Sequence, residues 1–130
     1  MAPAPLEDCL RAHPLIGQCV VVGDNRPFLG ALLTLDEEGL HHWRLLAGLG
    51  HLTRDELLRD RRLLRELQRA VDEANDLVSS AEAIRRFRVL PGEFTVASGH
   101  LTPSLKLRRA EVLRDFATEI DSLYEEEPPA

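Results

Sequence analysis

The sequence has little lysine, little cysteine and few aromatic residues, and each shortage excludes a class of function. Lys106 is the only lysine among 16 basic residues, and the other 15 are arginine. Aromatic side chains make up 5% of the chain and its formal net charge is -6, so it lacks the stacking platforms and positive charge of nucleic-acid-binding proteins. Cys9 and Cys19 have no CxxC partner and no histidine at zinc-ligand spacing. We therefore expect two reduced thiols, with no disulfide and no metal site.

Long hydrophobic runs and targeting segments are also missing. No stretch approaches about 18 consecutive apolar residues, which excludes a transmembrane helix. The first residues, Met1 to Pro5, do not combine a basic region with an apolar run as a secretory signal does. A cytoplasmic location is therefore expected.

The motifs of several kinds of catalysis are absent as well. The chain contains no glycine-rich phosphate-binding loop and no G-x-S-x-G nucleophile elbow. Its histidines at 41, 42 and 51 do not form a pair four residues apart on one helix face, which is a common zinc-ligand spacing. A complete nucleotide site, a serine hydrolase and a zinc enzyme are therefore not predicted.

What remains describes one soluble domain with an uneven charge distribution. The 130 residues are 44% hydrophobic and 29% charged, which is enough for a single hydrophobic core. Residues 84–114 carry seven basic and two acidic side chains, a net charge of +5, so the remainder carries -11. A basic segment in an acidic protein favours a local anion site. The alternative is a solvated face whose charges are balanced by neighbouring side chains.

The first third of the chain predicts a helix and a strand pair. Pro5 to Ala12 is expected to be helical and to stop at His13-Pro14, because proline disfavours helix at the residue before it. Residues 16–22 and 28–35 are apolar and predict an antiparallel hairpin around a turn at 23–27. Their nearly continuous apolar character predicts that both faces of the sheet are covered.

The middle third predicts helices. A short one contains Leu40, Trp43, Leu46 and Ala47 and ends near Gly48 or Gly50. Thr53 and Glu56 have the spacing of a capping box. From Asp60 a longer helix is predicted, with its apolar face formed by Leu63, Leu64, Leu67, Ala70, Val71, Ala74, Leu77 and Val78.

The last third predicts short strands, a loop and a helix. Residues 84–90 are expected to form a strand, Pro91-Gly92 a turn, 94–97 a return strand and 100–107 a loop. A final helix is predicted over 109–124, followed by an acidic tail at 125–130. The predicted fold class is α+β, with a small central sheet, made of a hairpin and further short strands, and helices packed around it.

Lys106 is the leading candidate for a functional residue. It stands in a Thr-Pro-Ser loop before a helix, where a mobile ammonium suits a compact anion such as phosphate or carboxylate. A single lysine among 15 arginines is consistent with a position where a guanidinium could not replace the ammonium group. Taken by itself, however, a loop lysine is more often simply solvated.

Several stretches of the chain resemble the C-terminal domain of long-chain fatty-acid–CoA ligases, which belong to the adenylate-forming enzymes. The stretches that carry this resemblance, in chain order, are Pro3-Ala-Pro-Leu-Glu7, His13-Pro-Leu-Ile16, Val20-Val-Val-Gly-Asp24, Phe94-Thr95 and Gly99-His-Leu-Thr-Pro-Ser-Leu-Lys-Leu-Arg-Arg109. The last stretch is the most specific. Its Leu105 before the lysine is typical of the long-chain branch, where other branches more often have Gly.

The resemblance implies a two-step reaction. Such ligases join a fatty acid to ATP, with Mg²⁺, to give an acyl-adenylate, and then transfer the acyl group to coenzyme A. The family's adenylation lysine corresponds to Lys106, which the resemblance makes catalytic, and the same domain is expected to supply part of the thioesterification site. The surrounding motif corresponds to Gly99, Thr102, Pro103, Ser104, Arg108 and Arg109. Arg108 and Arg109 either position the loop or are solvated, and no metal ligand is implied.

The resemblance also implies a missing partner. Residues 1–124 correspond to the mobile C-terminal domain, whereas the large N-terminal domain with the nucleotide pocket and acyl tunnel has no counterpart here. The chain alone is therefore expected to be inactive and to bind neither ATP nor coenzyme A tightly, and any peripheral membrane contact is expected in the large domain. His100 departs from the family, whose long-chain branch commonly has Glu there. Two alternatives stay open: a branch acting on short-chain or aryl acids, and a freestanding module that binds an anionic partner.

Overall fold

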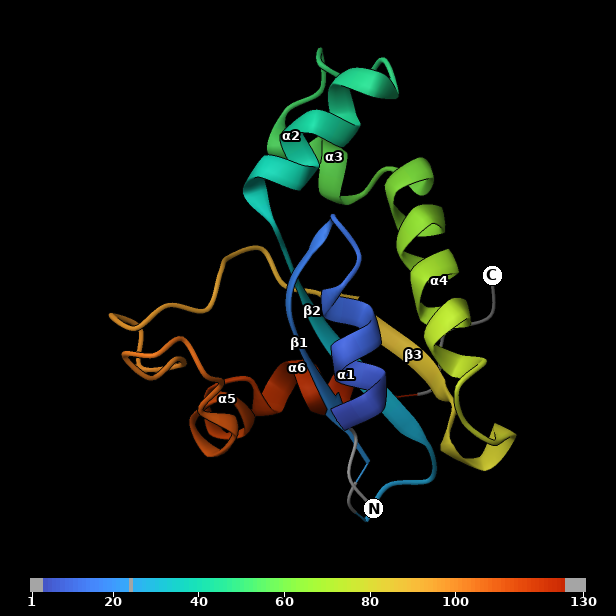
Figure 1. Ribbon diagram of the computed structural model, residues 1–130, viewed down its shortest axis with the longest axis vertical. Coiled ribbons are helices and arrows are strands. Elements are labelled where there is room, and N and C mark those ends of the chain that lie inside the picture. Colours follow the sequence, from blue (N-terminus) through green and yellow to red (C-terminus); the bar gives the residue numbers. More distant parts are fainter. Residues whose placement is uncertain (1–3, 24, 126–130) are drawn as a thin grey trace.

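A three-stranded mixed sheet forms the centre of the protein (Figure 1). The computed structural model describes residues 4–23 and 25–125. Strand β1 (Ile16–Val22) pairs antiparallel with β2 (Leu29–Leu35), and β3 (Ile84–Val89) pairs parallel with β2 on its other side. The predicted hairpin, the strand near residue 84 and the α+β class are confirmed.

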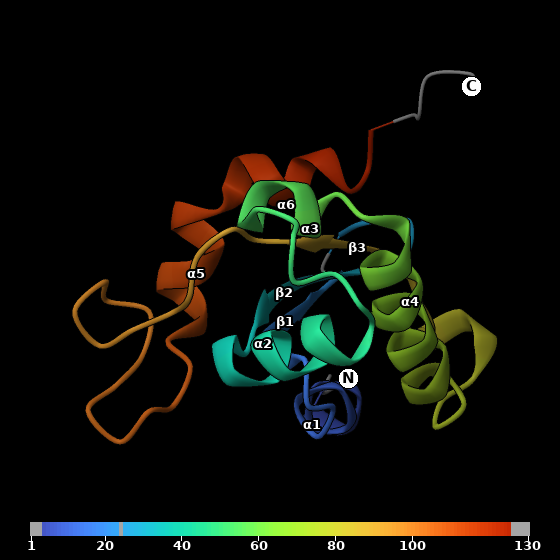
Figure 2. The ribbon, with the colours of Figure 1, turned by 90° about the horizontal axis from the view of Figure 1, so that it is seen from above.

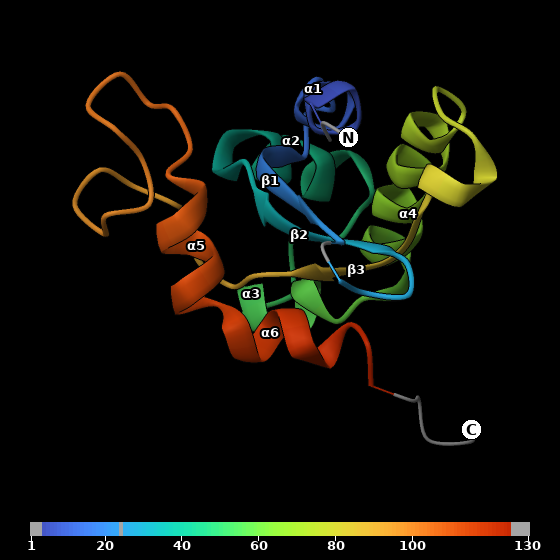
Figure 3. The same cartoon turned by 90° about the horizontal axis from the view of Figure 1, so that it is seen from below.

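Apolar side chains project from both faces of this sheet, because alternate strand residues point in opposite directions. Helices cover both faces. Cys19, Val21 and Leu33 belong to a core shared with the first four helices, while Val20 and Leu32 belong to a second core shared with the last two. Figures 2 and 3 show α1 (Ala4–Arg11) and α6 (Ala117–Ser122) on opposite sides of the sheet. The prediction that both faces are buried is confirmed.

The connection from β2 to β3 contains three helices, α2 (Glu37–Leu46), α3 (Arg54–Leu58) and α4 (Arg61–Asn75). The α2 helix ends before Gly48, whose φ of 75° is the left-handed conformation common after a helix. Thr53 and Glu56 form the predicted capping box of α3. The α4 helix packs against α1 through its apolar face. Four residues of the predicted apolar faces are instead exposed: Leu46, which is 75% exposed, and Ala47 at the end of α2, Leu64 on α4, and Leu77, which is 60% exposed, beyond the end of α4.

The chain returns from β3 to the opposite face of the sheet through α5 (Arg109–Asp115) and α6. The single helix predicted over 109–124 is therefore interrupted at Phe116, whose φ of -112° and ψ of 24° lie outside helical values. The interruption lets the Phe116 ring pack 5.5 Å from Phe94, while Ile120 and Leu123 cover the sheet.

The return strand predicted at 94–97 is wrong. Thr95 and Ser98 close a tight turn instead, because the Ser98 amide donates to Thr95 Oγ1 at 2.9 Å and the Thr95 amide donates to Ser98 Oγ at 3.1 Å. Short hydroxyl side chains compete with strand pairing in this way.

Two further features concern the limits of the described chain. The predicted tail lies outside the described residues except for Glu125, as does Asp24 of the predicted turn at 23–27.

None of the helices over residues 4–23 and 25–125 is long and apolar enough to cross a membrane.

Candidate functional site

The segment around Lys106 is a small hairpin, defined here as residues 100–108 and called the lysine hairpin. Leu101 and Leu107 pair across it, and the Arg108 amide donates to the His100 carbonyl oxygen at 2.8 Å. The prediction of a loop over 100–107 is therefore too simple, because this segment has a paired base and a defined turn.

The tip of the lysine hairpin is a three-residue turn formed by Pro103, Ser104 and Leu105. The Leu105 amide donates to the Thr102 carbonyl oxygen at 2.8 Å, and proline suits the first position of such a turn. Leu105 has a φ of 65° and is 64% exposed. Left-handed backbone costs a non-glycine residue about 1–2 kcal/mol, so the turn that precedes Lys106 is strained.

Thr102 holds the backbone of Lys106 from both sides. Its amide donates to the Lys106 carbonyl oxygen at 2.8 Å, and its Oγ1 accepts from the Lys106 amide at 3.0 Å. The Lys106 side chain is exposed. Over residues 4–23 and 25–125, no carboxylate oxygen lies within 4.0 Å, the distance of an ion pair, from the Lys106 ammonium group. The backbone of Lys106 is fixed while its charge is available to an external anion.

Arg109 has a different environment from Lys106. Its guanidinium donates to both carboxylate oxygens of Glu7, at 2.6 and 2.7 Å, and to the Val21 carbonyl oxygen at 3.2 Å. Glu7 is 5% exposed and also accepts from the Val21 amide at 2.8 Å. Arg109 therefore ties the start of α5 to α1 and β1.

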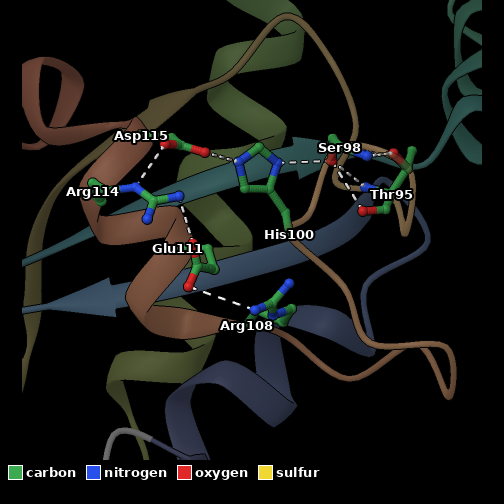
Figure 4. A network of polar contacts seen from close by, with 7 residues as sticks. All are labelled: Thr95, Ser98, His100, Arg108, Glu111, Arg114 and Asp115. Atoms are coloured by element: carbon green, nitrogen blue, oxygen red, sulfur yellow. Dashed lines mark hydrogen bonds and ion pairs between the residues drawn. The ribbon is translucent and has the colours of Figure 1, made fainter.

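Arg108 is more exposed, with 48% of its side chain accessible to solvent. Its guanidinium lies 3.6 Å from Glu111, which pairs in turn with Arg114, and Arg114 contacts Asp115 (Figure 4). The two arginines of the predicted motif thus contact carboxylates of the chain, whereas Lys106 has no such contact within residues 4–23 and 25–125.

A Ser–His–Asp contact chain lies at the base of the lysine hairpin (Figure 4). His100 Nδ1 lies 2.8 Å from Ser98 Oγ, and His100 Nε2 lies 2.8 Å from Asp115 Oδ2. The Ser98 hydroxyl also contacts the Thr95 carbonyl oxygen, and the Ser98 amide is bonded to Thr95 Oγ1. The contact chain links the tight turn at Thr95 and Ser98 to Asp115 at the end of α5.

Two pKa shifts follow from these surroundings. The hydrogen bond from His100, and then the one from Arg114, hold the pKa of Asp115 below its ordinary value, because both favour the ionised carboxylate. Burial, and secondly the charge of Glu7, raise the pKa of the Cys19 thiol to about 12. Both cysteines are free thiols.

The structure brings the predicted motif together only in part. Thr102, Pro103, Ser104 and Lys106 share the lysine hairpin, and Gly99 precedes it with a φ of 84°. Sequence reasoning did not find the supporting residues Glu7, Ser98 and Asp115. Glu7 lies in a stretch that carried the family resemblance, but its contact with Arg109 joins positions 102 residues apart and has no local signal.

Comparisons with known proteins agree with the resemblance. A family model described as the AMP-binding enzyme C-terminal domain matches residues 1–128. Over 98% of the chain, the sequence is 47% identical to the long-chain-fatty-acid–CoA ligase FadD15 of Mycobacterium tuberculosis, covering 21% of that protein. It is 31% identical, over 98% of the chain and 22% of the relative, to the putative fatty-acid–CoA ligase fadD11 of the same species. The chain spans about a fifth of the length of these relatives.

A solved structure shares the fold. The adenylation domain of a carboxylate reductase from Mycobacterium chelonae superposes with a TM-score of 0.71 at 25% identity, over 95% of this chain and 18% of that one.

Proposed function

The chain belongs to the family of AMP-binding enzyme C-terminal domains, and from this membership we propose that it acts as the C-terminal domain of a long-chain fatty-acid–CoA ligase. The observation that carries the proposal is the 47% identity to a ligase of that name over 98% of the chain. Because the match covers 21% of the relative, the remaining functional parts are proposed to lie in a large N-terminal domain.

The proposed reaction has two steps. In the first, the fatty carboxylate attacks the α-phosphate of ATP, forming the acyl–phosphate bond and releasing pyrophosphate. In the second, the coenzyme A thiol attacks the acyl carbon, forming the thioester and releasing AMP. ATP, with its Mg²⁺, and coenzyme A are substrates of the two-domain enzyme, and the large domain is proposed to hold most of their contacts.

Lys106 is proposed to act in the first step. Two anions, the carboxylate and the triphosphate, repel each other as they approach, and a positioned ammonium offsets that repulsion and stabilises the charge that develops during transfer. The observations that support this role are its fixed backbone, its exposed side chain and its lack of a carboxylate partner within the described chain.

Arg108 and Arg109 are proposed to support the lysine hairpin instead of binding substrate. Both guanidinium groups contact carboxylates of the chain, Glu111 and Glu7 respectively. The contact of Arg109 with Glu7 weakens the alternative of a freestanding anion-binding module, because it occupies one of the basic groups that such a module would use.

The second candidate is an adenylating domain for another class of acid, favoured by the fold match to a carboxylate reductase. A substrate panel on the full-length enzyme decides between the two. We expect pyrophosphate release with ATP to be fastest with palmitate and slow with acetate and benzoate, and the product with coenzyme A to be palmitoyl-CoA. Fastest release with benzoate or acetate would refute the long-chain assignment. Release that no carboxylic acid stimulates would refute adenylation altogether.

A further inference from the structure

His100 is buried at the base of the lysine hairpin. Its ring packs against both Phe94 and Phe116 in a cluster of three rings, with ring centroids at 5.4 and 5.2 Å, and the residue is 8% exposed. Both ring nitrogens have partners at 2.8 Å, Ser98 Oγ on one side and Asp115 Oδ2 on the other. Figure 4 shows the ring bridging these two groups. Its position is therefore fixed by packing and by two directional contacts.

The two contacts connect the hairpin to rigid parts of the molecule. Asp115 ends α5, which is anchored in the core by the fully buried Val112. Ser98 belongs to the tight turn that Thr95 closes before the hairpin. The His100 ring thus joins the turn on one side of the hairpin to the helix that follows it on the other side.

The backbone of His100 connects the ring to Lys106. Its carbonyl oxygen accepts from the Arg108 amide at 2.8 Å, which is the last rung at the base of the hairpin. Further along, Thr102 bonds both the amide and the carbonyl oxygen of Lys106. These hydrogen bonds connect the base of the hairpin at His100 to the Lys106 backbone.

We propose that His100 is a positioning residue, which sets the direction of the lysine hairpin, and hence of Lys106, through its contacts with Asp115 and Ser98. The proposal rests on the proposed role of Lys106 in acyl-adenylate formation. It also gives a reason for the departure from Glu at this position. Because Asp115 lies 2.8 Å from the ring nitrogen, a carboxylate at position 100 would face another carboxylate.

A first experiment tests the contacts in the 130-residue chain, with no dependence on activity. His100→Phe keeps an aromatic ring beside Phe94 and Phe116 but removes both polar contacts. We expect the Arg108 amide to exchange hydrogen at least about tenfold faster, while amides of β1 and β2 keep their rates. The matched control His42→Phe, at an exposed position of α2, should leave Arg108 unchanged. Unchanged exchange of Arg108 in His100→Phe would overturn the proposal.

The same measurement separates the proposed contact from general damage to the fold. Asp115→Asn keeps an oxygen that accepts from His100, and we expect a smaller increase in exchange than in His100→Phe. His100→Glu should increase the exchange strongly, and the added Asp115→Asn change should partly reverse it, because it removes the facing charge. An equal effect of His100→Glu with and without Asp115→Asn would contradict the assigned contact.

A second experiment tests the link to Lys106 in the full-length ligase. We expect His100→Phe to slow acyl-adenylate formation about tenfold to a hundredfold, the cost of a small misplacement, with little change in acyl transfer from preformed acyl-adenylate. In a Lys106→Ala background, His100→Phe should add no further loss, because it acts through the lysine. Additive losses, or equal losses in both steps, would overturn the positioning role. If Lys106→Ala alone has no effect, the proposed role of Lys106 fails and the kinetic role of His100 fails with it, whereas the substrate panel still tests the proposed ligase function and the exchange experiment still reports on the contacts.

Discussion

The buried contact between Glu7 and Arg109 gives the sharpest prediction for stability. One carboxylate, 5% exposed, accepts three hydrogen bonds, two from the Arg109 guanidinium and one from the Val21 amide. Glu7→Ala removes all three bonds. Glu7→Gln keeps an amide oxygen that accepts from Val21 but removes the charge that pairs with Arg109.

The magnitudes follow from what each change leaves without a partner. Losing one member of a fully buried ion pair costs about 3–5 kcal/mol. The Arg109 side chain is 40% exposed and regains water, which places Glu7→Ala near the lower end, at about 3 kcal/mol. The buried Val21 amide accounts for about 1–2 kcal/mol of this, so Glu7→Gln should cost about 1–2 kcal/mol.

Urea unfolding at neutral pH measures these free energies. A cycle of Glu7→Gln, Arg109→Met and the double variant should give a coupling energy of about 1–2 kcal/mol. The control is Asp8→Ala on the same helix, which breaks an exposed pair with Arg11 and should cost less than about 1 kcal/mol. The reasoning fails if Glu7→Ala costs no more than Asp8→Ala, or if the two sites show no coupling.

Three further predictions concern other residues. Leu105→Gly should raise the free energy of unfolding by about 0.5–1 kcal/mol in a thermal melt, because glycine removes left-handed strain at a mostly exposed position; a loss of stability would contradict the turn geometry. The lowered pKa of Asp115 stabilises the fold fully above its ordinary value of 3.8, and this contribution is lost as the pH falls through the lower folded-state value. Acid unfolding of Asp115→Asn should therefore lack this dependence below pH 3.8, and an unchanged acid profile would refute the shift. Cys19, with a pKa of about 12, should react with iodoacetamide at pH 8 only after unfolding, whereas Cys9 reacts in the native state; equal reactivity of the two thiols would contradict the burial of Cys19.

The parts of the fold that sequence predicted well depend on local patterns. The strands near residues 16 and 29 follow from apolar runs separated by a turn, and the capping box of α3 needs only Thr53 and Glu56. The strand predicted at 94–97 was wrong, because Thr95 and Val96 favour strands while the hydrogen bonds between Thr95 and Ser98 favour a turn.

The supports of the candidate site depend on contacts between distant segments. Glu7 and Arg109 meet only because α1 and α5 both pack near β1, and His100 meets Asp115 only once the hairpin folds back. The family resemblance of the hairpin sequence identified Lys106 as the candidate catalytic residue. The catalytic role of Lys106 stays a prediction. Local spacing allows the pairs of Arg108 and Arg114 with Glu111, each three residues apart, but it carries no information on the contact between Arg109 and Glu7.

The most direct test of the central claim measures the two half-reactions of full-length Lys106→Ala separately. In single-turnover assays with palmitate and ATP, we expect acyl-adenylate formation to fall at least about a hundredfold, the usual cost of losing a group that stabilises the transition state. Transfer from preformed palmitoyl-adenylate to coenzyme A should stay within about threefold of the unmodified enzyme. Equal losses in both steps, or an unchanged rate of adenylate formation, would contradict the role of Lys106.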